Sequence, residues 1–291
     1  MGKTVFDLGA LRNLLLPGLD VGTLWPTAIF WLTLVLLAGL EIMLPLHPDS
    51  RRDRRWPANL GLGLINLGLL PLVPVSIVVA AEWARANHIG LFNEFSLPWG
   101  VVALATVIVR SGAGYALHVL LHRVGPLWRI HRVHHFDTGI DVSTGFRTHP
   151  LEFVLAIGLG VLIAVSFGLS PITLIVYETA DAAFAFVTHA NLRLSPRLDR
   201  ILRHVIVTPT VHLVHHSPRR EETDSNYGNL LTIWDRLFGT YREPELLGHD
   251  LCEFGLGEVR DDRAHDLWWQ LKSPLLAELA APAESGAAQK P

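Results

Sequence analysis

Five long apolar runs limit what this chain can fold into. Residues 24–46, 58–82 and 97–121 are each long enough to cross a bilayer as a helix. Two shorter runs, 151–168 and 171–188, are joined by the turn-like sequence GLSP and fit a tight antiparallel hairpin better than two independent spans. Half of the residues are hydrophobic, which is unusual for a soluble domain. The sequence therefore predicts an all-α integral membrane protein with a transmembrane helix bundle.

The loop charges predict how this bundle is oriented. Residues 51–55, RRDRR, place four arginines between the first two runs, which predicts a cytoplasmic loop. The loop 82–98 carries only Arg85 and is expected on the other side. If the hairpin enters and leaves at one face, residues 189–291 are cytoplasmic as well. This count brings the histidine motifs to one face and predicts a cytoplasmic, histidine-rich helical cap.

The chain divides into three parts by composition. Residues 1–117 are expected to form the N-terminal transmembrane helices, and residues 118–243 a catalytic region that carries the histidine motifs and includes the hairpin 151–188. Residues 244–291 are expected to form a charged cytoplasmic tail whose last ten or so residues are disordered. The net charge of -3 gives no indication of a nucleic-acid partner, and the single Cys252 excludes an internal disulfide or a zinc–thiolate motif.

The histidines are concentrated in three motifs. Residues 118–122 read HVLLH, residues 131–135 read HRVHH and residues 212–216 read HLVHH, and they account for eight of the fifteen histidines. Imidazoles at positions i, i+3 and i+4 share one face of a helix. Neutral imidazole is a good ligand for zinc, copper, nickel and iron, and it is costly to bury without a partner. The motifs therefore predict a metal site rather than scattered core histidines.

Two further histidines lie at the ends of the hairpin. His149 precedes it and His189 follows it, so a hairpin that begins and ends at one face would return both to the same site. For each alone, a capping or interfacial role is the alternative. With the motifs they give enough ligands for two metal ions. The ten candidate ligands are His118, His122, His131, His134, His135, His149, His189, His212, His215 and His216.

These motifs resemble those of the fatty acid hydroxylase / sterol desaturase superfamily, which are membrane-bound, histidine-rich di-iron oxygenases. The resemblance covers most of residues 110–243, through HVLLHR, HRVHH, RTHP, THAN and the long segment TPTVHLVHHSPRREETDSNYGNLLTIWDRLFGTY. It implies two iron ions held by the ten histidines, with His149 matched through RTHP. It also implies O2 as co-substrate and electrons from NAD(P)H through a separate redox protein of the ferredoxin or cytochrome b5 type.

Four polar residues are candidates for supporting the ligands. Asp181 lies inside the hairpin, where relatives often carry a neutral amide, and an acid at that depth is costly. It could bond to a ligand histidine, as carboxylates do around metal sites, or lie in a water-filled cavity. Asn191 belongs to the THAN element, and Asp224 and Asn226 belong to the DSNYG segment. Hydrogen bonding to the ligands and a purely structural role both remain open for these residues.

Taken together, the sequence predicts an O2-dependent di-iron oxidoreductase that hydroxylates or desaturates a lipid. The lipid could be fatty acyl, sterol-like or isoprenoid, and the two reactions share the first hydrogen abstraction. The alternative is a membrane protein that binds or transports metal without oxygenase activity. A transporter is expected to place its ligands at mid-bilayer on broken helices, whereas here they cluster at one end of the predicted spans.

Overall fold

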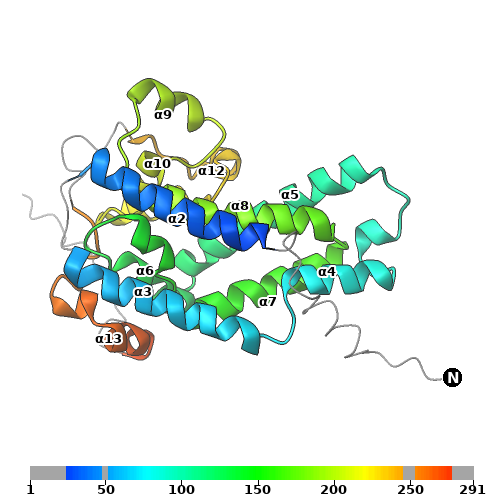
Figure 1. Cartoon of the computed structure of the whole chain (residues 1–291), viewed down its shortest axis with the longest axis horizontal. Coiled ribbons are helices and arrows are strands. Elements are labelled where there is room, and N and C mark those ends of the chain that lie inside the picture. Colours follow the sequence, from blue (N-terminus) through cyan, green and yellow to red (C-terminus); the bar gives the residue numbers. More distant parts are fainter. Residues whose placement is uncertain (1–23, 48–51, 245–252, 277–291) are drawn as a thin grey trace, which may run out of the picture.

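A bundle of long apolar helices carries a cap of short helices at one end (Figure 1). The computed structural model describes residues 24–47, 52–244 and 253–276. Within these residues, five helical segments are long and apolar enough to cross a membrane, which confirms the helical membrane-protein prediction. They are α2 (Trp25–Met43), the segment Arg52–Asn93 with α3 (Arg52–Leu69) and α4 (Ile77–Ala86), α5 (Trp99–Arg123), α7 (Pro150–Phe167) and α8 (Pro171–His189).

The second apolar run is broken in the middle. Helix α3 ends at Leu69, a 3-10 turn η2 (Leu70–Leu72) follows, and α4 begins at Ile77. Pro71 and Pro74 account for the break, because proline lacks the amide hydrogen that a helix needs and clashes with the preceding turn. Ser76 then caps α4 by accepting a hydrogen bond from the Val79 amide. As a result α3 contacts the cap, while α4 packs against α7 and α8.

The hairpin of α7 and α8 turns at the end of the bundle that lies away from the cap. Gly168 adopts φ +66°, a conformation that favours glycine, and Ser170 caps α8 by accepting from the Thr173 amide. The Ser170 amide donates to Oγ1 of Thr106, which fixes the turn against α5. The start of α7 and the end of α8 therefore both lie beside the cap.

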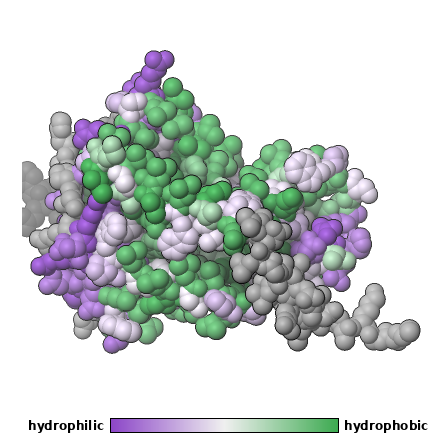
Figure 2. Space-filling model, viewed as in Figure 1, coloured by the Kyte–Doolittle hydropathy of each residue, from purple (hydrophilic) through white to green (hydrophobic). Residues whose placement is uncertain are grey.

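The cap is built from short elements around α6 and α10. The long helices, in contrast, expose apolar side chains on their surface. Leu32, Val35 and Ile42 of α2 are each more than 60% exposed. Figure 2 shows hydrophobic residues over much of the face in view, with hydrophilic residues mainly toward its left end and smaller patches of them at the top and right. The elements are α6 (Gly125–His135), η4 (Val142–Phe146), α9 (Pro196–Leu202), α10 (Pro209–His215), α11 (Arg220–Thr223), α12 (Ile233–Phe238), η6 (Asp262–His265), α13 (Leu267–Lys272) and η7 (Ser273–Leu275).

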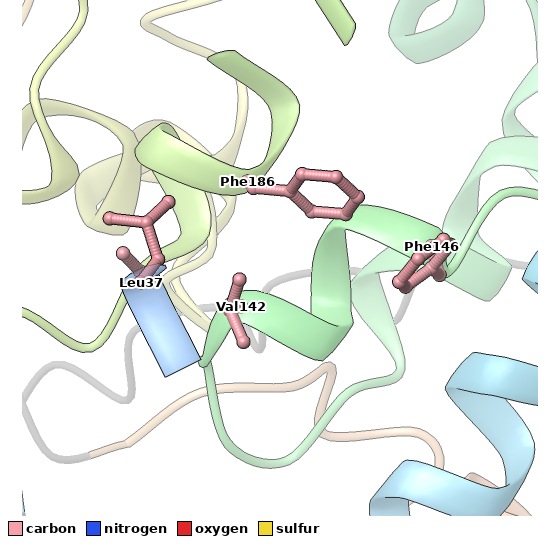
Figure 3. Close-up of a cluster of buried hydrophobic side chains, with 5 residues drawn as sticks. Leu37, Val142, Phe146 and Phe186 are labelled. Carbon is pink, nitrogen blue, oxygen red and sulfur yellow. The ribbon is translucent and has the colours of Figure 1, made fainter. Parts of the chain in front are cut away.

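An apolar cluster holds α2 against the cap end of α8. Leu37 of α2 packs with Val142 and Phe146 of η4 and with Phe186 of α8, all at most 9% exposed. Figure 3 shows the Phe186 ring projecting from α8 toward Phe146. Burying an aromatic side chain of this kind contributes roughly 1.5–3 kcal/mol. This packing positions the last turn of α8, where His189 lies.

A buried ionic network joins α3 to the cap. Arg55 donates to Asp137 at 2.6 Å and to Asp141 at 2.8 Å, and all three side chains are at most 2% exposed. Arg147 donates to Asn59 of α3 at 2.7 Å. Burial acts to raise the pKa of Asp137, but Arg55 and Arg147 outweigh it and hold that pKa below its usual range. Asp137 is therefore an ion at neutral pH, balanced by buried arginines.

The sequence predicted a loop at the arginine-rich residues, but residues 52–55 form the first turn of α3. Arg55 belongs to α3 and is fully buried, while Arg54 is about half exposed and pairs with Asp262 of η6. Both contacts place this segment at the same end of the molecule as the histidine motifs.

The described part of the C-terminal segment, residues 253–276, packs onto the cap. The Leu256 amide donates to the His135 carbonyl, and Arg132 donates to the Ser273 carbonyl. The last ten or so residues, expected to be disordered, lie outside the described residues.

Candidate metal centre

Nine of the ten predicted histidine ligands converge at the junction of cap and bundle. They form two groups, and within each group one ring nitrogen from every histidine lies within 4.8 Å of the others. Group A contains His118, His122, His131, His135 and His215, and group B contains His134, His189, His212 and His216. The groups adjoin, because the ring centroids of His135 in group A and His216 in group B are 4.9 Å apart.

Each His-x-x-His-His motif contributes to both groups. On α6, the first and last histidines belong to group A and the middle one, His134, belongs to group B. On the segment of α10 the assignment is reversed, so that only His215 joins group A. Group A is completed by two histidines one turn apart on α5, and group B by His189 at the end of α8. The spacing of the motifs thus serves two adjacent centres rather than one.

Backbone carbonyl groups set the protonation of several rings. A carbonyl oxygen can only accept a hydrogen bond, so a ring nitrogen that faces one carries the proton, and the other ring nitrogen is an acceptor. Four Nδ1 atoms face carbonyl oxygens in this way. They are His118 with Tyr227 at 2.8 Å, His134 with Arg147 at 3.0 Å, His189 with Ala185 at 2.6 Å and His215 with Ser225 at 2.8 Å.

In group B, two Nε2 atoms then face each other without a proton between them. Nε2 of His134 lies 3.0 Å from Nε2 of His189, and both are acceptors. In group A, Nε2 of His118 lies 3.1 Å from Nε2 of His131, whose Nδ1 faces the Glu152 carboxylate. Two lone pairs in contact repel each other, whereas a cation between them satisfies both. Two nitrogens about 2.1 Å from one ion and at right angles lie about 3.0 Å apart, so the spacing fits a metal.

Burial keeps the cap imidazoles neutral, as ligands must be. Burial and then His131 lower the pKa of His215 to about 3, although its hydrogen bond to Ser225 acts in the other direction. Burial followed by neighbouring imidazoles also lowers the pKa of His134, His135, His212 and His216 well below the usual value. Buried Nε2 atoms of His122 and His215 make no hydrogen bond. Both groups therefore present unprotonated nitrogens that fit transition-metal ions.

His149, the tenth predicted ligand, lies outside both groups. Its Nδ1 accepts a hydrogen bond from the Leu151 amide at 3.1 Å, and its Nε2 faces the Leu271 carbonyl at 3.2 Å. Both ring nitrogens are therefore used, and His149 belongs to neither group. The ring caps the start of α7 and ties it to the C-terminal segment.

The four supporting candidates divide into one that touches a ligand and three that do not. Oδ1 of Asp224 lies 3.1 Å from Nδ1 of His122. Asn191 bonds instead to the backbone at Leu46 and His47. Asn226, at φ +50°, donates to two backbone carbonyls and joins the start of α10 to residue 242. These two amide side chains hold backbone segments near the histidine groups in place and touch no ligand histidine.

Asp181 lies at a cavity rather than against a histidine. Its Oδ1 accepts hydrogen bonds from Asn229 at 2.8 Å and Tyr177 at 3.4 Å. The cavity has a volume of about 360 Å³ and is lined by both groups as well as by Asp181. Of the two roles expected for Asp181, a position at a cavity agrees with these contacts, and a bond to a ligand histidine does not.

A second, more apolar cavity of about 530 Å³ lies beside the first. Its lining includes Pro26 and Trp31 of α2 and Leu70 of η2. The two cavities share five lining residues, so only a thin wall separates them. The shared residues are Gly145, Thr148, Phe153, Ala182 and Ala185.

Glu152 is a residue that sequence reasoning missed. Its Oε1 lies 3.0 Å from Nδ1 of His131, in the first turn of α7. The only signal was an acid three positions after His149 in RTHPLE, and nothing in that sequence indicates which histidine it meets. Carboxylates of this kind fix the orientation of a ligand imidazole and raise its basicity.

The Glu152→Gln variant is expected to bind metal about 10–100-fold more weakly in group A, because the amide cannot hold the His131 imidazole as a carboxylate does. Competition with a metal-buffering chelator measures this affinity. The control is Glu94→Gln. Glu94 is an exposed acid before the start of α5, whereas the histidines of α5 lie near its other end. Equal affinities in the two variants would show that the Glu152 contact does not support the centre.

Comparisons with known proteins agree with this geometry. The family described as fatty acid hydroxylase matches residues 103–240, the segment that holds every histidine of groups A and B. No solved structure matches the chain.

Three relatives are enzymes named for lipid oxidation or a related reaction. The chain is 29% identical over 237 residues to the ornithine lipid hydroxylase of Rhizobium tropici, covering 77% of this chain and 69% of that protein. It is 29% identical to human alkylglycerol monooxygenase, covering 73% of this chain but only 46% of the relative. It is 27% identical to a very-long-chain aldehyde decarbonylase of Oryza sativa, covering 58% of this chain and 28% of the relative. Together with the helical bundle and the two histidine groups, the match over residues 103–240 and these relatives support the fatty acid hydroxylase superfamily as the family that this chain resembles.

Proposed function

We propose that this protein is an O2-dependent di-iron oxidoreductase that hydroxylates or desaturates a membrane lipid. The observation that carries the proposal is the 3.0 Å contact between the unprotonated Nε2 atoms of His134 and His189, within two adjoining groups of buried histidines. The relatives named above, which act on ornithine lipids and alkylglycerols, support a lipid as the substrate class. The proposed ligands are the nine histidines of groups A and B.

The chain's own residues hold, orient and enclose the centre. When bound, two iron ions would supply the reduction of O2 and the removal of hydrogen from an unactivated C–H bond. Tyr227, Arg147 and Ser225 fix three imidazoles through their carbonyl oxygens, so that each Nε2 is aimed inward. The histidines are buried, which limits their contact with bulk water. Electrons would come from NAD(P)H through a separate ferredoxin-type or cytochrome b5-type protein.

The two cavities support access from the membrane. The apolar cavity lies between α2, α3, α7 and α8, and the cavity at the histidines shares its wall. A lipid chain could enter between these helices and reach groups A and B by displacing Phe153 in that wall. The transport alternative lacks such support, because the groups lie at the end of the bundle rather than at the middle of broken helices.

The direct test is lipid mass spectrometry of cells with and without the gene, grown with and without O2. We expect a lipid that gains the mass of one oxygen atom or loses that of two hydrogen atoms, only with both gene and O2. The His134→Ala variant serves as the inactive control. A product that forms equally in the His134→Ala cells would contradict the proposal.

We also propose that the cap faces the cytoplasm. In a Cys252→Ala background, a cysteine at the exposed Asp53 or Arg197 should react with an impermeant thiol reagent only from the cytoplasmic side. A cysteine at the exposed Asn87, at the far end of α4, should react only from outside. Labelling of Asp53→Cys and Arg197→Cys from opposite sides would contradict a cap on one face.

A further inference from the structure

The cavity at the histidines has a polar end inside the bundle that the metal centre does not use. Arg110 of α5 and the α8 residues Tyr177 and Asp181 line this end, and Asn229 reaches it from the loop before α12. Asp181 precedes His189 by eight residues, a rise of about 12 Å along α8. Charged residues within membrane-spanning helices are costly, and they mark functional sites when they face a cavity.

Most of the hydrogen-bonding capacity of this cluster is satisfied within it. Arg110 makes a bidentate pair with Glu178, at 2.6 Å through Nε and 3.1 Å through Nη2. The Arg110 guanidinium carbon lies 5.7 Å from the centre of the Tyr177 ring, and Tyr177 donates to Oδ1 of Asp181. Oδ1 of Asp181 also accepts from Asn229.

Two groups of the cluster have no partner among the described residues. Nη1 of Arg110 and Oδ2 of Asp181 take part in none of the hydrogen bonds above, and both residues line the cavity. The cluster therefore offers a ligand one donor and one acceptor. A ligand that pairs with both gains affinity, because it makes two hydrogen bonds that the described residues leave unmade.

The charge of the cluster restricts that ligand. One arginine faces two carboxylates, Glu178 and Asp181, and the arginine is already paired with the first of them. An anionic group such as a carboxylate or phosphate would meet an excess of negative charge. An uncharged group that both donates and accepts a hydrogen bond would meet neither repulsion nor an unpaired atom.

We propose that this cluster binds the polar group of the lipid substrate, and that this group is an uncharged hydroxyl or amide. The proposal rests on the proposed lipid oxidation and names the class of substrate. Asp181, Ala185 and His189 follow one another at intervals of four on one face of α8, and all three line the cavity. The chain of the bound lipid would pass Ala185, and the carbon about 12 Å from the polar group would lie at the histidines.

Binding without O2 or an electron donor tests this site. Purified protein in detergent is incubated with tritiated hexadecanol, and unlabelled hexadecanol, hexadecanoic acid or hexadecane competes for it. We expect hexadecanol to compete about tenfold better than either of the others, as one satisfied buried hydrogen-bonding group implies. Equal competition by hexadecane and hexadecanol in the wild-type protein would overturn the proposal.

Two variants of Asp181 separate the acceptor from the charge. Asp181→Leu removes the acceptor and should weaken hexadecanol binding about tenfold. Asp181→Asn removes only the charge, so it should keep hexadecanol binding and strengthen hexadecanoic acid binding about tenfold. The control is Thr173→Val on α8, whose hydroxyl bonds to Ser170 outside both cavities. Wild-type selectivity in both Asp181 variants would overturn the proposal.

This result is separable from the oxidation itself. Selective binding without any O2-dependent product would leave the polar site standing and count against the oxygenase. An O2-dependent product from a protein that binds the three probes equally would support the oxygenase and overturn the polar site.

Discussion

The His134→Ala variant is expected to retain about one metal ion per chain where the wild type holds about two, and to lose lipid oxidation. His134 is one of four histidines in group B, so its loss leaves three, whereas group A keeps all five. Changes that only touch a ligand's hydrogen-bond partner cost about 10–100-fold in metal affinity, so loss of the ligand itself should cost more. Elemental analysis of the purified protein gives the stoichiometry, and product formation gives the activity.

The reciprocal variant, His215→Ala, should remove the ion of group A and leave that of group B. His204→Ala is the matched control, because His204 is exposed and belongs to neither group. Unchanged stoichiometry in both His134→Ala and His215→Ala would contradict the ligand assignment. Zinc in place of iron in a purified sample would not, since imidazole sites bind zinc more tightly than ferrous ion.

The Arg55→Ala variant is expected to be about 3–5 kcal/mol less stable than the wild type, because it removes the buried arginine that hydrogen-bonds to both Asp137 and Asp141. For a chain of this size the apparent Tm should fall by roughly 10 °C, measured in detergent by loss of soluble, folded protein on heating. Because Asp137 lies two residues after the α6 motif, metal binding should weaken as well.

The neighbouring Arg54→Ala variant is the control for this effect. It breaks an exposed pair with Asp262, and pairs of that kind contribute about 0–1 kcal/mol. Similar Tm values for Arg54→Ala and Arg55→Ala would show that the buried network does not stabilise the junction of α3 and the cap.

Periodic features of this fold were predictable from the sequence, and non-periodic ones were not. The apolar runs predicted the long helices, because a run of spanning length has few other solutions. The grouping of nine histidines followed from spacings of three and four on helices. Arg55 was interpreted as a loop charge, because its burial depends on Asp137 and Asp141, which lie 82 and 86 residues away.

His149 and Glu152 show the same limit within the site. A histidine before Pro150 can cap a helix or bind a metal, and only the path of the C-terminal segment decides, by bringing the Leu271 carbonyl to its ring. Glu152 meets His131 because α7 starts beside α6, a packing relation that no local pattern carries. The local sequence indicates which residue types can bind or support a metal, but tertiary packing determines which partner each residue contacts.

The division of each motif between groups A and B makes the two centres depend on the helical phase of α6 and α10. One residue inserted before His131 could be absorbed in the loop, but one inserted between His131 and His134 would turn the following histidines by about 100°. It would misdirect ligands of both centres at once, whereas a single histidine substitution disturbs only one. The number of residues between these histidines therefore matters more to the two centres than any single histidine does. A form of the protein with one ion can be reached by substituting a histidine but not by changing the length of a motif.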